Sequence, residues 1–487
     1  MKILFVSPEV APFAKVGGLG DVGAALPRQL HALGHDVRVF LPFYPRVLEH
    51  APDPEVVLPR LSFTVGPRTV QCSLLATELP GTSCPVYLVK CPGLFEREAI
   101  YSNDPDEHLR FSAFAWAALL GSKALDFAPD IVHVNDWTTG LIPLMLKVGF
   151  SKDAHLGTAR SVLTIHNLGH QGTFPASVLP ETGLAQARHL FHEDQLKEGR
   201  LSYLLTGLMY AHAITTVSPT YAREIQTPEQ GFGLDWALRA RRDVLVGILN
   251  GIDEEEWDPR TDTHLTHHFD ADTLETKEEN KKELLAGAGM PYRPEVPVIA
   301  MCSRLVYQKG IDLCMEALPS LLRQHRFQLV VLGKGEPKYE GFFRELQKAH
   351  RGQVEFDPTF SERKAHVVEA GADMLLMPSM FEPCGLNQMY SLRYGTVPIV
   401  HRTGGLADTV WNYDDVAAPQ GTGFLFDHHD ASGLTWAVKR ALKVWGTGQG
   451  DDRERWRQIQ RNGMKLPFGW RHRVGRYVEL YEQVAAR

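Results

Sequence analysis

The chain has few cysteines, no excess of positive charge and no long hydrophobic run. Its six cysteines form no Cys-x-x-Cys pair and are too sparse for a disulfide framework, so we interpret them as mostly reduced thiols, which favours the cytoplasm. The formal net charge of −7 provides no basic field, which argues against nucleic acid or an anionic membrane as a partner. The apolar stretch after Lys2 is too short for a signal peptide, and residues 111–120 are too few to span a bilayer. We expect a soluble protein.

Short apolar runs alternate with helical patterns along the whole chain. With 487 residues, the chain exceeds the size at which one hydrophobic core keeps growing, so two domains of similar size are expected. The runs are KILFVS, DVRVFLPF, PDIVHVND, RSVLTIHN, AITTVS and LVGILNG in the first half, and VPVIAMCSR, QLVVLGKGE, DMLLMPS and TVPIVHRTGG in the second. Each run is apolar and ends in polar residues, which is typical of buried parallel strands with ligand-facing loops at their carboxyl ends.

Three segments carry expectations of their own. The polar stretch from Asp258 to Glu295 lacks a sustained apolar period, which predicts a surface connection and an exposed helix near a domain junction. Pro27 lies inside the first helical pattern and predicts a kink, or a helix whose regular part begins there. Residues 468–487 predict a closing amphipathic helix. Its apolar stripe consists of Val474, Tyr477, Val478 and Tyr481.

A glycine-rich loop, KVGGLGD, follows the first predicted strand and precedes a helix with an acidic cap at Asp21. Glycine lets a ligand approach the backbone amides, and a helix N-terminus attracts anions, so phosphate is one candidate ligand. A tight turn without a ligand explains the same pattern equally well.

Two cations, Arg304 and Lys309, lie in the segment SRLVYQKG after a predicted buried strand. A guanidinium and an ammonium at the carboxyl end of such a strand suit a diphosphate, whose negative charge they stabilise as it leaves. Considered without that placement, two loop cations are more often simply solvated.

The segment MPSMFEPCGLNQ again follows a predicted strand and precedes a helix. Glu382 is either a charge at the helix start or a group that faces a cationic reaction centre. The amides of Gly385 and Leu386 are placed to meet phosphate or sugar hydroxyls. Cys384 has no base nearby in sequence, which favours packing or ligand contact over a nucleophilic role.

Histidines in HVNDW and TIHNLGHQG have no metal-ligand spacing, so we interpret them as neutral hydrogen-bonding groups for a hydroxylated substrate. The Asp-x-Asp strings at Asp104/Asp106 and Asp270/Asp272 lie in polar stretches with no buried strand before them, and we interpret them as loop charges. We therefore expect neither a metal nor a cofactor.

These motifs together resemble bacterial glycogen synthases and plant starch synthases, in order and spacing, from Met1 to the last helix. The motifs are KVGGLGDV, HVNDW, TIHNL with the following Gln-Gly pair, NGID-x-x-x-WDP, SRL-x-x-QKG, FEPCGLNQ and RTGGLADTV. The resemblance implies an α/β fold of GT-B architecture, in which two Rossmann-like doubly wound domains face each other across a cleft. It places an acceptor-side domain at residues 1–246, a nucleotide-sugar-binding domain at 247–466, and a helix at 467–487 that crosses back to the first domain.

The activity implied by the resemblance is the transfer of glucose from ADP-glucose to the nonreducing 4-OH of an α-1,4-glucan such as glycogen, with retention of the α configuration and without a metal. The residues implied to be catalytic are Glu382, His166, Arg304, Lys309 and Asp136. The residues implied to bind substrate are Lys15, Gly18, Gly20, Tyr101, Trp137, Asn167, Asn250, Cys384, Gly385, Leu386 and Thr403. In this assignment Lys15, with the amides of Gly18 and Gly20, binds the diphosphate or the glucose beside it.

The other residues divide between donor, transferred glucose and acceptor. Arg304 and Lys309 hold the leaving diphosphate. His166, Asn250 and Glu382 contact the transferred glucose, and Glu382 stabilises positive charge at its ring, with residues 384–386 lining the same pocket. The positions near the acceptor are Tyr101, Asp136 and Trp137, where aromatic faces suit a sugar chain. The mechanism we expect is same-face attack, in which a phosphate oxygen of the leaving group takes the acceptor proton.

One motif departs from the family pattern: this chain has GKGE at residues 333–336 where many relatives have a small hydroxyl residue in place of Lys334. The base preference is therefore open, and UDP-glucose is the alternative donor. A dinucleotide-dependent oxidoreductase is disfavoured because the first loop is not G-x-G-x-x-G and no acidic residue ends the second strand. A glucan phosphorylase would need pyridoxal phosphate and a longer chain. An inactive glucan-binding protein on the same scaffold is the non-enzymatic alternative.

Overall fold

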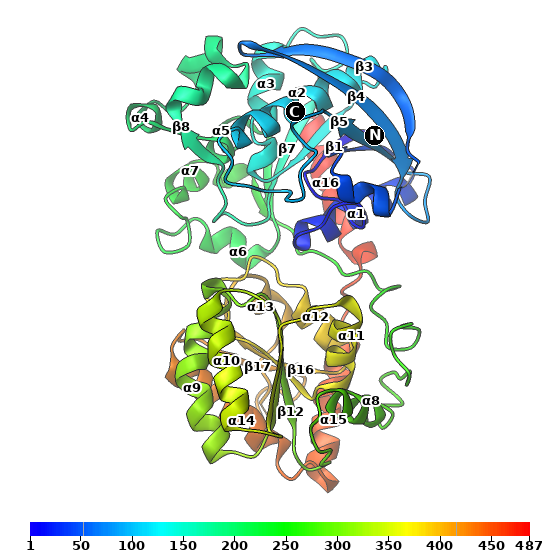
Figure 1. The fold of residues 1–487 in the computed structure, drawn as a ribbon, viewed down its shortest axis with the longest axis vertical. Helices are drawn as coiled ribbons and strands as arrows, with labels where there is room; N and C mark the ends of the chain where they lie inside the picture. The colour runs from blue at the N-terminus through cyan, green and yellow to red at the C-terminus, as the bar shows by residue number, and fades with distance from the viewer. Residues whose placement is uncertain (52, 415) are drawn as a thin grey trace. The chain divides into compact units, whose positions relative to one another are not determined.

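The computed structural model describes residues 1–51, 53–414 and 416–487. The chain folds into two compact units (Figure 1). Unit 1 contains Met1–Gly251 together with Trp470–Arg487, and unit 2 contains Ile252–Gly469.

Unit 1 is built on a nine-stranded sheet in the order β11-β10-β7-β6-β1-β2-β5-β4-β3. All neighbours are parallel except the pairs β3–β4 and β4–β5, which are antiparallel. These strands are β1 (Lys2–Val6), β2 (Asp36–Pro42), β3 (Glu55–Val65), β4 (Arg68–Glu78), β5 (Pro85–Lys90), β6 (Ile131–Asn135), β7 (Arg160–Ile165), β10 (Ala213–Thr216) and β11 (Leu245–Gly247). A separate small hairpin pairs β8 (Thr173–Pro175) with β9 (Arg200–Ser202).

Most α-helices of unit 1 lie in the connections between these strands, and α16 is added from the C-terminal segment. They are α1 (Gly18–Ala32), α2 (Glu107–Ala124), α3 (Ile142–Gly149), α4 (Glu193–Lys197), α5 (Tyr203–Tyr210), α6 (Pro219–Glu224), α7 (Asp235–Ala240) and, from the end of the chain, α16 (Val474–Ala485). Short 3₁₀ helices are η1 (Pro45–Glu49), η2 (Trp137–Thr139), η3 (Ala176–Thr182), η4 (Ala185–Leu190), η5 (Arg242–Val244) and η7 (Trp470–His472).

Unit 2 is a doubly wound α/β layer structure with a six-stranded parallel sheet in the order β14-β13-β12-β15-β16-β17. Its strands are β12 (Val298–Cys302), β13 (Gln328–Leu332), β14 (Val354–Asp357), β15 (Met374–Met377), β16 (Val397–His401) and β17 (Phe424–Phe426). The helices are α8 (Lys277–Gly287), α9 (Ile311–Gln324), α10 (Pro337–Ala349), α11 (Glu362–Gly371), α12 (Asn387–Arg393), α13 (Gly404–Thr409), α14 (Ala431–Trp445) and α15 (Gly450–Met464), with η6 at Tyr307–Lys309. Figure 1 shows α9, α10 and α14 on one face of the sheet and α8, α11 and α15 on the other.

Each sheet has a point where the strand order reverses. In unit 1 the chain runs from β1 outward to β2 on one side and continues with β6 on the other side of β1. In unit 2 it runs from β12 to β13 and β14, then returns to β15 on the other side of β12. Ligands of doubly wound folds bind beside the carboxyl ends of the strands at such a switch point. The loops after β1, β6, β12 and β15 are therefore the places to search for a site.

Helix α8 corrects one prediction. The polar segment that contains it was expected to form an exposed helix, but Lys277 and Lys281 are 5% and 1% exposed. Lys277 Nζ donates to the carbonyls of Glu369 and Ala370 and to Thr396 Oγ1 at 3.1, 2.7 and 2.8 Å, and burial lowers its pKa to about 7. The lysines are buried because partners satisfy their donors.

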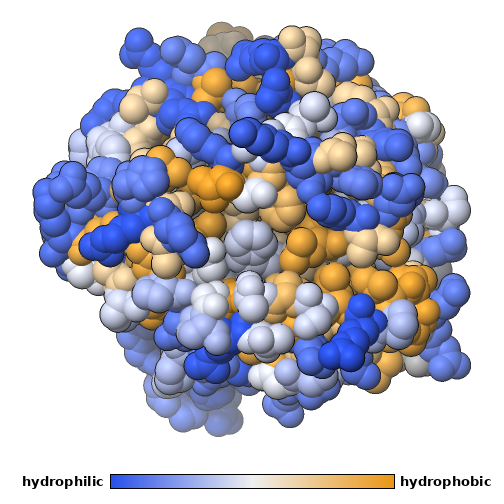
Figure 2. Space-filling view, turned by 90° about the horizontal axis from the view of Figure 1, so that it is seen from above, coloured by the Kyte–Doolittle hydropathy of each residue, from blue (hydrophilic) through white to orange (hydrophobic). Residues whose placement is uncertain are grey.

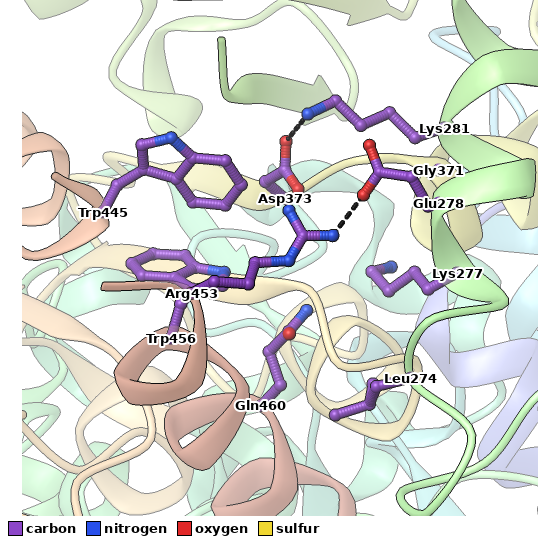
Figure 3. A pocket seen from close by; sticks show the side chains of 10 residues that line it. All are labelled: Leu274, Lys277, Glu278, Lys281, Gly371, Asp373, Trp445, Arg453, Trp456 and Gln460. Carbon is purple, nitrogen blue, oxygen red and sulfur yellow. Dashed lines mark hydrogen bonds and ion pairs between the residues drawn. The ribbon is translucent and has the colours of Figure 1, made fainter. Parts of the chain in front are cut away.

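A small cavity beside α8 is lined by further charged pairs (Figure 3). Lys281 contacts Asp373 at 2.9 Å, and Arg453 pairs with Glu278 against the two tryptophans Trp445 and Trp456. All of these groups belong to unit 2, and none is a predicted site residue. Because their charges already bind one another, the cavity has the character of an internal packing region.

Helix α1 begins at Gly18 with Gly17 as its N-cap, ahead of the acidic cap predicted at Asp21. Pro27 lies inside it, so the alternative in which the regular helix begins at that proline is wrong. The predicted closing helix is α16, which buries Val474, Tyr477 and Tyr481, while Val478 is only partly buried. Tyr481 reaches the middle of the first sheet, where its hydroxyl lies 2.6 Å from His133 Nδ1 on β6.

Among the described residues, none of the helices combines the length and the apolar composition that crossing a bilayer requires. The face shown in Figure 2 mixes hydrophilic and apolar residues, as protein surfaces generally do. Two exposed apolar side chains, Val16 at 52% and Tyr307 at 56%, lie in the loops that follow β1 and β12.

Candidate active site

Glu9 organises the loop after β1. Its carboxylate is 3% exposed, and Oε2 accepts hydrogen bonds from the amides of Val16 at 2.6 Å and Gly17 at 3.1 Å. Oε1 accepts from the Tyr101 hydroxyl at 2.6 Å. Burial raises the pKa of Glu9, while these donors oppose that rise. The glycine-rich loop is thus held in one shape by a carboxylate that sequence reasoning missed, because a single glutamate outside a motif gives no signal.

Lys15 projects from this loop and pairs with Asp21 in the first turn of α1, with 2.6 Å between Nζ and the carboxylate. Its side chain is 47% exposed, so the ammonium lies at the surface of unit 1 beside the helix start. A Cβ on Gly20 would lie 2.9 Å from Lys15 Cγ. Glycine is therefore required at residue 20 for the lysine stem to lie against the helix.

Asp136 follows β6 at the other side of the switch point and has a strained backbone, with φ of 54°. One carboxylate oxygen accepts from the His166 amide at 2.7 Å, and the Asn167 amide also bonds to the carboxylate. Burial raises its pKa to about 7, with these amides opposing the shift and the Glu9 charge adding to it. Strain of this kind is concentrated at functional sites.

His166 is held in a fixed orientation because its Nε2 lies 2.9 Å from Asn135 Oδ1. Asn135 in turn donates from Nδ2 to the Val6 carbonyl at 3.0 Å, so the ring is tied to both β1 and β6. Burial lowers the pKa of His166 to about 3, and the imidazole is neutral at physiological pH. This agrees with the neutral hydrogen-bonding role expected from the sequence. Asn135, the asparagine of the HVNDW motif, was not assigned a role from the sequence.

Aromatic side chains gather around Trp137. Its ring centroid lies 4.9 Å from that of Phe111, 5.8 Å from Phe174 and 6.4 Å from Tyr101. A Cβ on Gly172, whose φ is 56°, would lie 2.2 Å from Trp137 Cε3. The Gln-Gly pair is therefore explained by the close approach of Trp137 to the backbone.

Asn250 is 3% exposed, and its Oδ1 is buried with no hydrogen-bond partner among the described residues. A buried carbonyl oxygen left without a donor costs about 1–3 kcal/mol, so such atoms call for an explanation. A bound hydroxyl group would supply the missing donor. Asn167 differs, because its Oδ1 already accepts from the Gly169 amide at 3.0 Å.

Lys309 and Glu382 meet across the switch point of unit 2. Lys309 Nζ lies 2.6 Å from Glu382 Oε2, and both side chains are largely buried, at 16% and 7% exposure. The same oxygen accepts from Ser379 Oγ at 2.8 Å. Gln308 fastens the two loops, because its carbonyl accepts from the Met380 amide at 2.9 Å and its side chain donates to the Phe381 carbonyl at 3.2 Å.

Arg304 lies in the same loop as Lys309 and is exposed. Its guanidinium makes no hydrogen bond or ion pair with any residue that the structure describes. The GKGE segment runs beside it: the Leu305 amide donates to the Lys334 carbonyl at 2.9 Å. A Cβ on Gly333 would lie 1.9 Å from the Ser303 carbonyl oxygen, so both glycines flanking Lys334 are needed for this approach. The Lys334 side chain is exposed.

The loop from Glu382 to Leu386 packs against the start of α13. Cβ atoms on Gly404 and Gly405 would lie 1.9 Å from the Glu382 oxygen and 2.0 Å from the Cys384 oxygen, and the Gly405 amide donates to the Glu382 carbonyl at 3.0 Å. Gly385 has φ of 70°, which favours glycine. Cys384 and Thr403 are buried in this contact. The RTGG motif therefore supports the backbone that carries Glu382, a role sequence reasoning did not assign.

The predicted residues form two groups, one in each unit, in the loops at the switch points and in loops after neighbouring strands. The group in unit 1 comprises Lys15, Gly18, Gly20, Tyr101, Asp136, Trp137, His166, Asn167 and Asn250. The group in unit 2 comprises Arg304, Lys309, Glu382, Cys384, Gly385, Leu386 and Thr403. The functional groups that sequence reasoning missed are Glu9, Asn135, Ser379, Gly404 and Gly405. Their signal is spatial, because each acts on a motif residue through a contact in the folded chain: Glu9 and Ser379 act within one loop, and Asn135, Gly404 and Gly405 act from another strand or helix.

Comparison with known proteins gives full-length relatives. Residues 2–240 match the family described as starch synthase catalytic domain, and residues 291–463 match glycosyl transferases group 1. The glycogen synthase of Anaeromyxobacter sp. is 45% identical, and the match covers 100% of both chains. Glycogen synthase 1 of Methylococcus capsulatus is 43% identical over 100% of this chain and 97% of the relative.

Solved structures agree. The catalytic domain of Starch Synthase IV from Arabidopsis thaliana, bound to ADP and acarbose, has a TM-score of 0.90 at 32% identity, covering 100% of this chain and 99% of that chain. Sucrose-phosphate synthase from Thermosynechococcus elongatus has a TM-score of 0.62 at 20% identity over the same shares, which supports the fold alone.

The chain has two α/β units built on mainly parallel sheets, with charged loops at the switch points. Together with the matches to glycosyltransferase families and to a starch synthase structure, this defines a glycosyltransferase with the GT-B fold. Within that class, the chain belongs to the glycogen synthase family, to which starch synthases are related. Both the fold class and the family expected from the motifs are confirmed.

Proposed function

We propose that this protein extends α-1,4-glucan chains by transferring glucose from ADP-glucose to the nonreducing-end 4-OH, with retention of the α configuration. Residues 1–246 would supply the acceptor side and residues 247–466 the nucleotide-sugar side, with 467–487 completing the first unit. The single observation that carries the proposal is the buried pair of Lys309 and Glu382 at the switch point of unit 2, with Arg304 exposed beside it.

That arrangement suits a leaving diphosphate. Arg304 has no partner among the described side chains and offers a fork of donors that matches phosphate oxygens. Lys309 adds a point charge that neutralises developing negative charge, an effect of several kcal/mol in a water-poor site. In unit 1, Lys15 and the amides near Gly18 and Gly20 would bind the diphosphate or the glucose beside it.

Glu382 would stabilise positive charge that develops on the glucose ring, close to its 3-OH and 4-OH. One oxygen of its buried carboxylate is bound by Lys309 and Ser379, so the charge of the lysine offsets the cost of burying the carboxylate. Asn250, whose buried Oδ1 has no hydrogen-bond partner among the described residues, would accept a bond from a glucose hydroxyl. His166, neutral and fixed by Asn135, would contact the same sugar.

Retention would proceed by attack on the face from which the diphosphate leaves, with a phosphate oxygen taking the acceptor proton. Two carboxylates are candidates for a covalent alternative, Asp136 and Glu382. Both are engaged by donors, Asp136 by two backbone amides and Glu382 by Lys309 and Ser379, which lowers their nucleophilicity. A glucosyl adduct trapped on either residue, detected by mass spectrometry of the peptide, would refute same-face attack.

The family implies ADP-glucose as the donor, and the related Starch Synthase IV structure contains bound ADP, which supports this choice. The acceptor is a glucan for the same reason, and Trp137 with Tyr101 would offer aromatic faces to it. Side-by-side turnover of ADP-glucose and UDP-glucose tests the base preference near the GKGE loop. Faster turnover of UDP-glucose would overturn the donor assignment and leave the glucan transfer intact.

The central experiment incubates the protein with ADP-[14C]glucose and glycogen, with and without a chelator. Label in the polymer is expected in both samples. Glu382→Ala and Lys15→Ala should nearly abolish transfer while their thermal unfolding stays cooperative. Lys348→Ala, which breaks an exposed pair with Glu345 on α10, is the matched control and should retain full activity. If the folded wild-type protein incorporates no label into glycogen, the proposal is wrong, and an inactive glucan-binding protein is favoured instead.

A further inference from the structure

Three metal-ligating side chains of unit 2 converge outside the site described above. Glu256, Glu362 and His366 each offer one ligand atom, and these atoms all lie within 4.8 Å of one another. Glu362 and His366 are one turn apart on α11, while Glu256 comes from the segment that precedes α8. The two glutamates are exposed and the histidine is 0% exposed.

The His366 ring is fixed by its surroundings. Its Nδ1 lies 2.7 Å from Asp262 Oδ2, and that carboxylate oxygen also accepts from the Tyr394 hydroxyl at 2.6 Å. Trp257 stacks on the ring with centroids 3.7 Å apart and an interplanar angle of 14°. A carboxylate that binds one nitrogen of a histidine fixes the tautomer and leaves the lone pair on the other nitrogen, which is the arrangement of metal-binding histidines.

His366 Nε2 is buried and has no hydrogen-bond partner among the described residues. Leaving such an atom unsatisfied costs free energy, and native proteins rarely do so without a ligand or a water. Because Nδ1 is taken by Asp262, Nε2 is the nitrogen that remains to coordinate. The carboxylates of Glu256 and Glu362 therefore lie close to a histidine nitrogen whose lone pair accepts no hydrogen bond from the described residues.

We propose that Glu256, Glu362 and His366 form a binding site for a divalent transition metal of the zinc type. One imidazole and two carboxylates are a common ligand set for such an ion, and solvent completes the coordination. Calcium and magnesium are disfavoured because they prefer oxygen ligands alone. The exposed glutamate side chains can turn toward the ion, and the histidine is already held in place.

None of the three ligands is among the groups assigned to glucosyl transfer, and the role we assign to the metal is structural. Trp257 is stacked between His366 and Tyr390 of α12, with 3.8 Å between the Trp257 and Tyr390 centroids. A metal would therefore tie the segment around Glu256 to α11 and brace the stack that reaches α12. No metal-ligand spacing marks this set in the sequence, because Glu256 is remote from the other two ligands along the chain.

The test uses the full chain, treated with chelator and then titrated with Zn²⁺ by calorimetry and with Co²⁺ by visible spectroscopy. One equivalent is expected to bind, with Co²⁺ showing ligand-field bands, and Zn²⁺ should raise the melting temperature. The double variant Glu256→Gln/Glu362→Gln changes only exposed groups and should weaken Zn²⁺ binding at least tenfold and abolish the shift in melting temperature.

A charge-matched control is Glu316→Gln/Glu345→Gln, which neutralises two exposed glutamates on α9 and α10 and should bind Zn²⁺ as the wild type does. His366→Ala should also lose the Co²⁺ bands, provided that it melts cooperatively. No stoichiometric binding by the wild type, or equal binding by the Glu256→Gln/Glu362→Gln variant, would overturn the proposal. Glucosyl transfer should be unchanged in that variant, so this test is independent of the proposed activity.

Discussion

Lys309 Nζ lies 2.6 Å from Glu382 Oε2, so the two side chains act as one buried unit. They come from the loops after β12 and β15, the two neighbouring strands between which the sheet of unit 2 reverses its order. Each charge offsets the desolvation of the other, and removal of one partner leaves an uncompensated buried charge.

The pair predicts strongly non-additive kinetics. Lys309→Ala and Glu382→Ala should each lower kcat by about 10²–10³-fold, and the double variant should be little worse than the more damaged single variant. Steady-state rates for the wild type, the two single variants and the double variant form a double-mutant cycle, which gives the coupling energy between Lys309 and Glu382. The exposed pair Lys348/Glu345 provides the control cycle, for which a coupling below about 0.5 kcal/mol is expected. Additive losses at Lys309 and Glu382 would mean that the two groups work separately.

Loosening the loop after β1 should weaken donor binding. Glu9→Gln cannot accept from Val16, Gly17 and Tyr101 as the carboxylate does, because an amide has only one acceptor oxygen. We expect KM for ADP-glucose to rise about tenfold, where each lost bond contributes about 1 kcal/mol. Tyr101→Phe should give a smaller rise of the same kind.

The control for that loop is Tyr210→Phe, which removes a hydroxyl bond to the Leu190 carbonyl elsewhere in unit 1. It should lower the melting temperature and leave KM unchanged. An unchanged KM in Glu9→Gln would show that the loop keeps its shape without this carboxylate.

Asp136 predicts a pH dependence of stability. Burial raises its pKa to about 7 in the folded protein, against about 4 in an unfolded chain. Between these values the folded state binds more protons, so this group makes the free energy of unfolding fall as pH rises toward 7. Asp136→Asn removes that fall, and Asn tolerates a positive φ. The urea midpoint of the variant, relative to wild type, should therefore increase from pH 5 to pH 7.5.

Asp106→Asn is the opposite case. The hydrogen bond from Arg97 holds the pKa of Asp106 below its usual range, so its stabilising contribution is already complete at pH 5 and is lost only in acid. The difference in urea midpoint between this variant and wild type should be constant from pH 5 to pH 7.5. A constant difference for Asp136→Asn as well would contradict the raised pKa.

Adding a single methyl group at Gly310 should have a large effect on stability and activity. Its φ is 70°, and a Cβ there would lie 1.9 Å from the Pro378 oxygen, in the loop that carries Glu382. Gly310→Ala should destabilise the protein by more than about 2 kcal/mol and reduce activity. Gly287→Ala, at the end of α8 with no atom within 4 Å of the added Cβ, should be neutral or stabilising by up to about 1 kcal/mol. Similar melting temperatures for the two variants would refute the argument.

Sequence reasoning found ten of the buried parallel strands because each is a short apolar run with both faces covered. It missed β3 and β4, whose alternating exposed positions carry little apolar signal, and also β5 and the short strands β8, β9, β14 and β17. It judged α8 exposed because a helix with several lysines has no apolar stripe, whereas Lys277 is buried through bonds to carbonyls that are distant in sequence. Residue type predicts burial poorly when the partners come from another element.

The motif residues of the site were predictable because they occupy loops with recognisable spacing, such as QKG and EPCG. Their mutual contacts were not, since Lys309 and Glu382 are separated by most of a βαβ series and meet only because β12 and β15 are neighbours. Glu9 and Asn135 were missed for a related reason: each holds a site residue in place, Glu9 from outside any motif and Asn135 from within HVNDW, through contacts that the sequence does not show. The GKGE loop was predicted to matter, and the structure places its backbone beside Leu305.

Because Trp470–Arg487 belongs to unit 1, the first unit is completed by a segment that is synthesised after the whole of unit 2. The hydroxyl of Tyr481 on α16 contacts His133 on the central strand β6, so this part of the sheet stays exposed to solvent until α16 has been synthesised. On a ribosome, residues 252–469 would be made in full before the first unit could close, which reverses the usual order in which the N-terminal domain finishes first.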